Sequence, residues 1–433
     1  MHEIVIVGGG AGGLELATRL GDSLGRQGKA NVTLIDAART HLWKPLLYEV
    51  AAGSLNSHAD QLEYLAQAHW HHFRFRLGRM DGLDRENKQV YVAPVHDENG
   101  AEIIHRRSFR YDTLVIAIGS IANDFGVPGV QDNCLMLDTP EQAQEFHDRL
   151  INACLRAHTQ ETPIQAGQLT VGIVGAGATG VELAAELHGT TRELSAYGLE
   201  NIDPDKHIKL VLVEAADRVL SGLPPRLSAA VMERLTDLGI EAHTGERVVE
   251  VRPDGFATAG GKFIPASMMV WSAGIKAPDF LANLAGLETN WINQLVVRPT
   301  LQCTRDDDVF AFGDCAACPM PDGSTVPPRA QAAHQQASLL VRTIKRRLAG
   351  KPPQEYKYTD YGSLVALGRY STVGNLMGAL TGGSVMVEGA IARLVYWSLH
   401  KMHQVALNGL FKTVLGSIAN IINAPNRPTI KLH

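Results

Sequence analysis

Cysteine is scarce in this 433-residue chain, and long apolar runs are missing from it. The five cysteines are sparse and odd in number, so they predict no disulfide framework and fit a reducing compartment. No uninterrupted apolar run approaches about 18 residues, which argues against a membrane-spanning helix. The first predicted strand begins at once, so no secretory signal is expected. We therefore expect a soluble body in the cytoplasm.

Acidic residues are absent from the last part of the chain. Between Gly389 and His433 there is no Asp or Glu, and five cations give this segment a formal charge of +5. These cations are Arg393, Lys401, Lys412, Arg427 and Lys431. Because the whole chain carries -5, residues 1–388 carry -10, which gives no reason to expect nucleic-acid binding. The basic tail instead predicts binding to an anionic surface, either a membrane or a partner protein.

Two glycine fingerprints are present, and each follows an apolar run typical of a buried strand. The first is Gly8, Gly9, Gly10, Ala11, Gly12 and Gly13, and the second is Gly175, Ala176, Gly177, Ala178, Thr179 and Gly180. In such a turn the glycines allow a tight bend, close approach of a pyrophosphate and packing of helix on strand. The diphosphate then lies at the helix N-terminus, where free N–H groups favour anions. The chain is therefore predicted to bind two dinucleotides.

An acidic residue ends the strand that returns after each fingerprint. Asp36 follows the first fingerprint at close to the spacing expected of a ribose-binding acid, and Glu214 follows the second after a longer polar loop. A carboxylate accepts hydrogen bonds from the ribose hydroxyls and repels a 2′-phosphate. Glu214 therefore favours NADH over NADPH. The alternative is that both acids are ordinary strand ends.

The pattern of strands and helices predicts an α/β fold with two doubly wound Rossmann-type nucleotide-binding domains, one inserted in the other. Residues 308–312 form an apolar run that ends in Gly313 and Asp314, and we expect it to return to the first sheet. The expected boundaries are 1–120 and 291–350 for the two parts of the first nucleotide domain, 121–290 for the second, and 351–433 for a C-terminal helical region.

These residues resemble the two-dinucleotide flavoprotein reductases of the glutathione-reductase-like class. The resemblance implies FAD at the first fingerprint and NADH at the second. The implied FAD contacts are Gly8, Gly9, Gly10, Ala11, Gly12, Gly13, Asp36, Gly119, Gly313 and Asp314. The implied NADH contacts are Gly175, Gly177, Thr179, Gly180, Glu214, Ala273 and Gly274.

Three further segments are similar to those of type II NADH:quinone dehydrogenases. Residues 330–335 match that family's quinone-site pattern, residues 41–47 with Lys44 match its loop beside the flavin, and Glu182 follows the second fingerprint. The resemblance implies that Gln331 and Gln335 orient a lipid quinone, and that Glu182 orients NADH or assists proton delivery. Independently of the resemblance, the two amides are i,i+4 neighbours on one helix face and could hydrogen-bond quinone carbonyls. The alternative is a solvated glutamine-rich face.

The resemblance further implies electron transfer from NADH through FAD to the quinone without proton pumping, at the cytoplasmic face of a bacterial inner membrane. Other readings are a sulfide:quinone-type reductase, another NADH-dependent flavin reductase, or an NADH-sensing flavoprotein. Cys315 and Cys318 fit either a redox or metal dithiol or, as we prefer, loop packing beside the cofactor. His69, His71 and His72 are interpreted as a solvated patch, because no ligand spacing accompanies them, and no metal site is expected.

The tail shows two apolar stripes of helical periodicity, over 391–409 and 411–422. Each predicted helix is too short to cross a hydrocarbon core of about 30 Å. Cationic amphipathic helices without acids are suited to lie in the membrane interface. We expect the tail to bind the membrane surface without crossing it. The alternative is that the helices pack on the body of the protein or on a second copy, as a homodimer.

Overall fold

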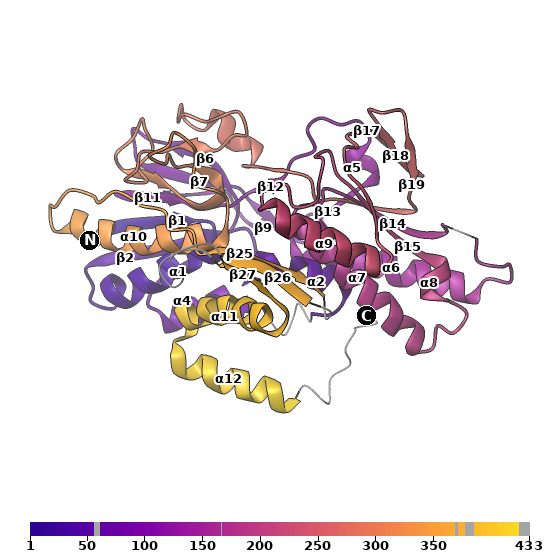
Figure 1. Ribbon diagram of the computed structural model, residues 1–433. Coiled ribbons are helices and arrows are strands. Elements are labelled where there is room, and N and C mark those ends of the chain that lie inside the picture. The colour runs from indigo at the N-terminus through magenta and orange to yellow at the C-terminus, as the bar shows by residue number, and fades with distance from the viewer. Residues whose placement is uncertain (56–60, 166, 369–370, 377–384, 424–433) are drawn as a thin grey trace. The chain divides into compact units, whose positions relative to one another are not determined.

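The computed structural model describes residues 1–55, 61–165, 167–368, 371–376 and 385–423. The chain folds into two compact units, each assembled from separate stretches (Figure 1). The first unit contains Met1–Trp43, Gln61–Ile121 and Ile275–Asp360. The second contains Lys44–Asp60, Ala122–Gly274 and Tyr361–His433.

A five-stranded parallel sheet in the order β23-β11-β1-β2-β5 forms the centre of the first unit. Its inner strands bury their apolar residues, as parallel sheets covered on both faces require. The strands are β1 (His2–Val7), β2 (Ala30–Asp36), β5 (Arg74–Leu77), β11 (Thr113–Ile116) and β23 (Val309–Ala311). The predicted return of residues 308–312 to this sheet is therefore confirmed, because β23 pairs with β11.

Helices α1 (Ala11–Leu20) and α10 (Ala330–Leu348) pack against each other in this unit. Two polar contacts, one helical turn apart, join these helices. His334 Nδ1 lies 2.5 Å from Glu15, and Arg19 donates to Ser338 at 2.6 Å. Further elements of this unit are β3 (Thr40–His41), β4 (Leu62–Glu63), α4 (Tyr64–Trp70), β6 (Met80–Asp84), β7 (Gln89–Val92), β8 (Val95–His96), β9 (Glu102–Ile104), β10 (Arg107–Arg110), β21 (Ile275–Lys276), β22 (Leu295–Val296) and β24 (Ala316–Ala317).

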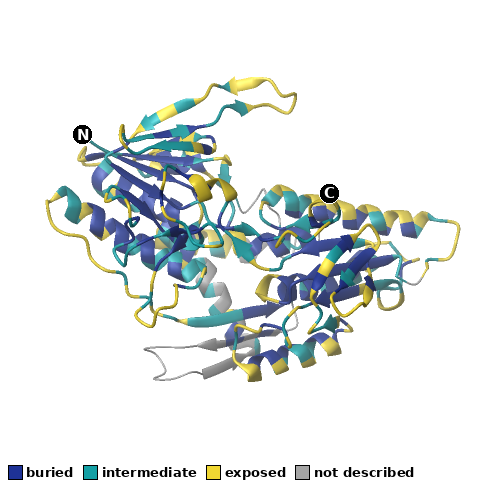
Figure 2. Ribbon diagram, turned by 90° about the horizontal axis from the view of Figure 1, so that it is seen from above, coloured by how far each residue is buried: buried dark blue, intermediate teal, exposed yellow. Residues whose placement is uncertain are grey.

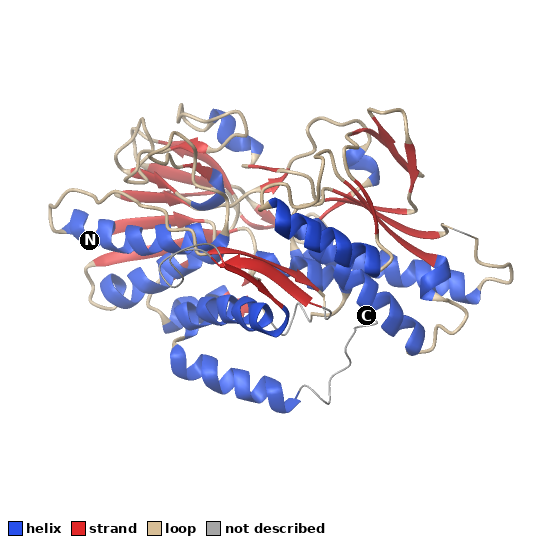
Figure 3. Ribbon diagram, viewed as in Figure 1, coloured by secondary structure: helices blue, strands red, loops and turns tan. Residues whose placement is uncertain are grey.

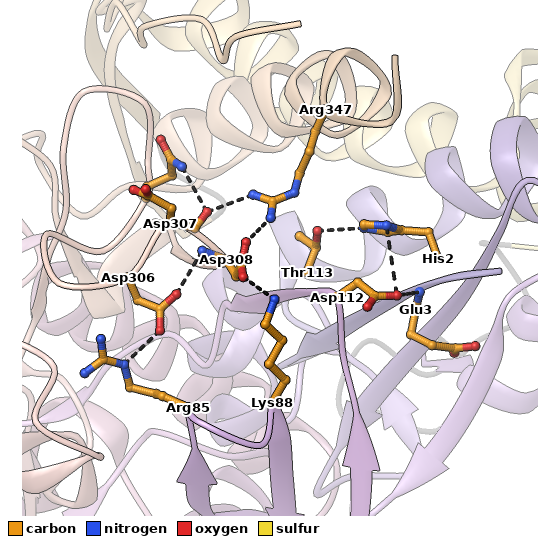
Figure 4. A network of polar contacts seen from close by, with 11 residues as sticks. His2, Glu3, Arg85, Lys88, Asp112, Thr113, Asp306, Asp307, Asp308 and Arg347 are labelled. Carbon is orange, nitrogen blue, oxygen red and sulfur yellow. Dashed lines mark hydrogen bonds and ion pairs between the residues drawn. The ribbon is translucent and has the colours of Figure 1, made fainter. Parts of the chain in front are cut away.

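Charged side chains hold the starts of the central strands together (Figure 4). Asp308, just before β23, binds both Lys88 and Arg347. Beside it, His2 pairs with Thr113 at 2.9 Å, which ties the start of β1 to β11. These contacts fix β23 in the sheet, and so they position the Gly313–Asp314 turn that follows it.

The second unit repeats the architecture with the order β13-β20-β14-β15-β16, again parallel throughout. The strands are β13 (Leu135–Met136), β14 (Leu169–Val174), β15 (Ile208–Val213), β16 (Glu241–His243) and β20 (Met268–Trp271). A small antiparallel sheet of β17 (Val248–Arg252), β18 (Gly255–Thr258) and β19 (Phe263–Pro265) packs over it. Gly172 makes room for this packing, because a Cβ there would meet the Phe256 ring at 2.4 Å. The strands of both parallel sheets are largely dark blue in Figure 2, which marks buried residues.

The longest helix of this unit outside its C-terminal part is α6 (Pro140–Thr159). It begins with a capping box, in which Thr139 and Gln142 bond reciprocally. The others are α2 (Leu47–Ala52), α5 (Val130–Asn133), α7 (Ala178–Ala196), α8 (Pro204–His207) and α9 (Pro225–Asp237). The predicted α/β fold with two nucleotide-binding Rossmann-type sheets is confirmed.

The C-terminal part of the second unit contains a sheet that the sequence analysis did not predict. Strands β25 (Gly362–Leu367), β26 (Ser371–Leu376) and β27 (Val385–Glu388) form an antiparallel sheet (Figure 3). Helix α11 (Gly389–Asn408) packs on β26, and α12 (Leu410–Asn423) follows it. Within the described residues, no helix has the length and apolar character needed to span a bilayer. Arg427, Lys431 and the side chain of Arg393 lie outside the described residues.

Candidate functional site

Both glycine fingerprints adopt the same tight turn. Gly8 has φ 101° and Gly175 has φ 100°, a left-handed conformation that favours glycine. A Cβ on Gly13 would lie 1.9 Å from the carbonyl oxygen of Gly8, and a Cβ on Gly180 would lie 1.9 Å from that of Gly175. Each third glycine therefore lets its helix start directly against the preceding strand.

The two predicted acids bind the backbone in the same way. Asp36 accepts N–H bonds from Gly9 at 2.5 Å and from Ala38 at 2.8 Å. Glu214 accepts N–H bonds from Ala176 at 2.6 Å and from Ala216 at 2.9 Å. Each carboxylate is thus fixed beside its fingerprint at the end of the second strand. Burial raises the pKa of Asp36, although its backbone hydrogen bonds oppose this shift.

Three glycines at or near these turns leave their backbone uncovered, as close approach of a dinucleotide requires. A Cβ on Gly10, Gly119 or Gly177 would meet nothing within 4 Å, so the backbone at these points faces open space. A ligand can approach such backbone closely, with helix N–H groups available to its phosphates. In the second unit, Ala273 lies against Gly175, since a Cβ there would be 2.8 Å from the Ala273 Cα. The predicted Ala273–Gly274 turn therefore borders the second fingerprint.

Two side chains that the sequence analysis did not assign hold the first turn from outside. His41 Nδ1 lies 3.0 Å from the Gly9 carbonyl oxygen, and the Tyr64 hydroxyl donates to the same oxygen at 2.8 Å. Burial lowers the pKa of His41 to about 4, so the ring is neutral at pH 7. Tyr64 lies in a segment without clear periodicity, and no signal in the sequence connects it to Gly9.

The Gly313–Asp314 turn is held by three side chains. Ser120 donates to Asp314 Oδ2 at 2.9 Å, and Gln294 donates to the Asp314 carbonyl at 2.9 Å. Gln336 of α10 accepts the Gly313 N–H at 2.8 Å and is buried. Gln336 was not predicted, although the 3.6-residue periodicity of α10 places it on the buried face.

Gln331 and Gln335 lie on α10, half-buried, and both amides hydrogen-bond other parts of the chain. Gln335 donates to the Thr359 carbonyl at 2.8 Å and accepts the Thr359 N–H at 3.0 Å. Gln331 donates to Asp360 at 3.3 Å, and Arg329 also binds this carboxylate at 3.1 Å. The first turns of α10 are therefore fixed in place by the segment that ends the first unit.

Glu182 is a buried carboxyl on the second turn of α7. Its Oε1 accepts the backbone N–H of Ala366, in β25, at 3.0 Å. Burial raises the pKa of Glu182 to about 8, and the negative charges of Glu49 and Glu186 act in the same direction. The side chain of Glu182 therefore carries a proton at neutral pH.

Other predicted residues have ordinary surroundings in the structure. Lys44 lies in the second unit, where its Nζ donates to Asp138 at 3.1 Å. Cys315 and Cys318 are fully buried, and burial raises the pKa of both thiols to about 12, which keeps them protonated. His69 and His72 are exposed, and His71 pairs with Asp22. The described residues contain no cluster of three metal-ligating side chains.

The C-terminal helix α12 exposes one apolar face. Between Leu410 and Ile418, its five large apolar side chains are between 47% and 76% exposed. They are Leu410, Phe411, Val414, Leu415 and Ile418. In contrast, α11 buries Ala392, His403 and Leu407, while Leu394 and Met402 on its other side are exposed. The two helices thus extend an apolar surface away from their own unit.

Comparison with known proteins identifies the family. The family model described as pyridine nucleotide-disulphide oxidoreductase matches residues 2–337. The chain is 42% identical over 445 aligned residues to a type II NADH:quinone oxidoreductase of Haemophilus influenzae, covering 100% of both chains. The chain belongs to the type II NADH:quinone oxidoreductases. A family member from Mycobacterium tuberculosis is 28% identical over 96% of this chain and 87% of its own. The predicted family is therefore confirmed, as are FAD and NADH as its two nucleotides.

More distant solved structures share the fold. NDH2 from Plasmodium falciparum in complex with NADH has a TM-score of 0.80 at 17% identity, covering 99% of this chain and 100% of that one. The sulfide:quinone oxidoreductase from Aquifex aeolicus has a TM-score of 0.72 at 18% identity, covering 94% of this chain and 92% of that one. At these identities the likeness concerns the fold alone. The full-length relatives therefore favour NADH:quinone oxidoreduction over the sulfide:quinone alternative.

Proposed function

We infer that this chain oxidises NADH and passes two electrons through FAD to a quinone. The observation that carries this inference is the pair of equivalent turns, each closed by its own strand-end carboxylate, in two separate units. The first unit adds the glutamine-bearing helix α10 directly beside the Gly313–Asp314 turn. When bound, FAD supplies the two-electron chemistry.

The residues of the chain are proposed to bind and orient the reactants. In the first unit, Gly8–Gly13, Gly119 and Asp314 hold FAD, with Asp36 on its ribose. In the second unit, Gly175–Gly180 and the Ala273–Gly274 turn hold NADH, and Glu214 selects it against NADPH. Gln331 and Gln335, whose amides bind Asp360 and Thr359 in the structure, are proposed to bind the quinone carbonyls. Glu182 holds a proton within the second unit and releases it for quinone reduction.

The donor and the acceptor can be tested together. We expect NADH to support rapid reduction of a water-soluble quinone by the purified holoenzyme, NADPH to support it at least about tenfold more slowly, and sulfide to support none. Rates with the three donors at equal concentration decide between the readings. Faster quinone reduction with sulfide than with NADH would overturn the proposal.

We also propose that α12 lies on the membrane surface, where lipid quinone is found, on the cytoplasmic side. The exposed apolar face of α12 supports this, and the acid-free basic tail favours anionic lipid. Each exposed CH₂ that enters the acyl region contributes about 0.8 kcal/mol, so several large side chains suffice for reversible binding.

The structure suggests a sharper truncation than removal of the entire tail. Deletion of residues 409–433 removes α12 and keeps α11, which packs on β26. This variant should no longer bind vesicles of anionic lipid, but it should still pass electrons from NADH to a soluble acceptor. Trp291→Ser is the matched control, because Trp291 is 84% exposed in the first unit. Full sedimentation of the truncated protein with vesicles would contradict membrane binding by α12. A change from dimer to monomer would instead assign the face to a second copy.

A further inference from the structure

Two glutamates lie one helical turn apart on α7, and they differ in burial. Glu182 is 7% exposed, whereas Glu186 is half-buried. As i,i+4 neighbours they share one face of the helix, with Cβ atoms about 5–6 Å apart. Both face the segment at β25, because Glu182 binds the Ala366 N–H and Glu186 Oε2 would lie 3.4 Å from a Cβ on Gly368. The seam between α7 and β25 therefore contains an inner and an outer carboxyl group.

A third carboxylate acts on Glu182 from a different element. Glu49 belongs to α2, which packs against α7, and it is half-buried. The charges that raise the pKa of Glu182 after burial are those of Glu49 and Glu186. Strand β25 contributes no ionisable side chain between Gly362 and Leu367, only the Ala366 N–H that opposes the shift. Because neighbouring negative charges repel one another, the three carboxyl groups of Glu49, Glu182 and Glu186 are not all ionised at once.

The proposed reaction needs a proton from solvent. NADH, one proton and a quinone yield NAD⁺ and a quinol, so the hydride supplies two electrons and one hydrogen, and water must supply the second. A buried acid that gives up its proton must regain one before the next turnover. Glu182 is largely buried and its carboxyl contacts β25, whereas Glu186 is more exposed, so Glu186 offers its proton a path from solvent.

We propose that Glu186 takes protons from solvent and passes them to Glu182, while Glu49 keeps Glu182 protonated between turnovers. This rests on the proposed function, in which Glu182 releases a proton for quinone reduction. A proton from water first binds the Glu186 carboxylate. The Glu186 O–H then transfers it to the ionised Glu182 carboxylate, and Glu186 returns to its charged form. No electrons move in these steps, and only O–H bonds break and form.

The two neighbours can be separated by amide substitution. Glu186→Gln and Glu49→Gln each remove a negative charge, so both should lower the pKa of Glu182 from about 8. Only Glu186→Gln should interrupt proton supply. Glu233→Gln on α9 is the inert control, because Glu233 is exposed and lies on another helix. Glu186→Asp is the rescue, since it keeps an ionisable carboxyl at the same position.

The first readout does not depend on turnover. Infrared titration of the protonated carboxyl band in the oxidised holoenzyme, without quinone, should show the Glu182 midpoint moving to lower pH in Glu186→Gln and Glu49→Gln. Glu233→Gln should titrate like the unmodified protein. Unchanged midpoints in both neighbour variants would overturn the proposal. If the midpoints shift but the unmodified holoenzyme reduces no quinone, the proposed function fails and the carboxyl coupling stands apart from it.

The second readout is the rate in H₂O and D₂O with saturating NADH and a soluble quinone. At pH 7, Glu186→Gln should be about tenfold slower, with a larger solvent isotope effect, because proton supply becomes limiting. Glu49→Gln should stay within about twofold of the unmodified rate, and Glu186→Asp should recover most of the loss. A wild-type rate and isotope effect in Glu186→Gln, or an equal loss in Glu186→Asp, would exclude Glu186 as the proton entrance.

Discussion

The turn at Gly8 and the turn at Gly175 use the same contacts but have different neighbours. In each, a strand-end carboxylate accepts the N–H of the fingerprint's second residue at 2.5 or 2.6 Å. Around the first turn, Tyr64 and His41 bind the Gly9 carbonyl, and the Phe312 ring would lie 2.5 Å from a Cβ on Gly12. The equivalent of Gly12 in the second unit is Thr179, which is exposed.

This comparison shows that local sequence determines the turn, whereas distant segments determine what surrounds it. The turn itself depends on three glycines and one acid within about 40 residues, and therefore forms twice from local sequence. What surrounds the turn comes from distant segments, and it differs because each unit has its own partners. The first turn is bordered by α10 and by Phe312, whereas Glu182, the buried acid of α7, contacts β25.

The largest expected effect comes from filling the equivalent third glycines. Gly13→Ala and Gly180→Ala each place a Cβ 1.9 Å from a carbonyl oxygen, so the helix must move away from its strand. Gly13→Ala should yield protein without bound flavin. Gly180→Ala should keep its flavin but lose most reduction by NADH. Visible absorbance before and after NADH measures both.

Gly189→Ala is the control for these two variants, because a Cβ there meets nothing within 4 Å and the residue lies inside α7. Loss of flavin from Gly180→Ala, with flavin retained in Gly13→Ala, would reverse the assignment of the two units.

The second effect is a change in the free energy of unfolding, expected for substitution of Glu182 and compared with substitution of Glu214. The folded-state pKa of Glu182 is about 8, above its ordinary value of 4.5. The native state therefore holds a proton that the unfolded state loses, and stability from this group falls as pH rises from about 4.5 to 8. Glu182→Gln removes this dependence and should be more stable above pH 8, by at most about 5 kcal/mol.

Urea unfolding at pH 5 and pH 9 measures the difference for Glu182→Gln. Glu214→Gln is the comparison, because Glu214 is only partly buried and accepts two backbone N–H bonds. Glu214→Gln should lower the stability at both pH values, because an amide oxygen accepts these two N–H bonds less strongly than a carboxylate. An equal pH dependence in the Glu182→Gln variant and the unmodified protein would contradict a raised pKa.

The third effect is confined to the first unit. Gln335→Leu removes an amide that bonds both backbone groups of Thr359, and Gln331→Leu removes a bond to Asp360. Each variant should slow quinone reduction about tenfold while flavin reduction by NADH stays near normal. Rapid mixing of each half-reaction separates these steps. A loss limited to the NADH step would remove the quinone assignment from α10.

The smallest expected effect is a change of nucleotide preference. Glu214→Gln removes the charge that repels a 2′-phosphate, so the ratio of kcat/KM for NADH to that for NADPH should fall about tenfold. Asp36→Asn in the first unit carries the equivalent change and should leave the ratio unchanged. If the unmodified enzyme used NADH and NADPH equally well, Glu214 would not determine the choice of nucleotide.

The two turns and their acids could be predicted because their contacts are local or follow a fixed spacing. The exposed apolar face of α12 could be predicted for the same reason, from its helical periodicity. The partner of Glu182 could not be predicted, because Ala366 lies 184 residues away and donates only a backbone N–H. The sheet of β25–β27 was missed for a related reason, since its short strands give little periodic signal. Tyr64 reaches Gly9 only through the fold, from 55 residues away.

An anaerobic two-step titration tests the central claim, which is that the two units bind FAD and NADH and act in series. NADH added to the oxidised holoenzyme should bleach the visible flavin absorbance with one equivalent per flavin. A soluble quinone added afterwards should restore the absorbance, again with one equivalent. Gly180→Ala should keep the second step after chemical reduction but fail the first. Bleaching by NADH without recovery on adding quinone would contradict the account.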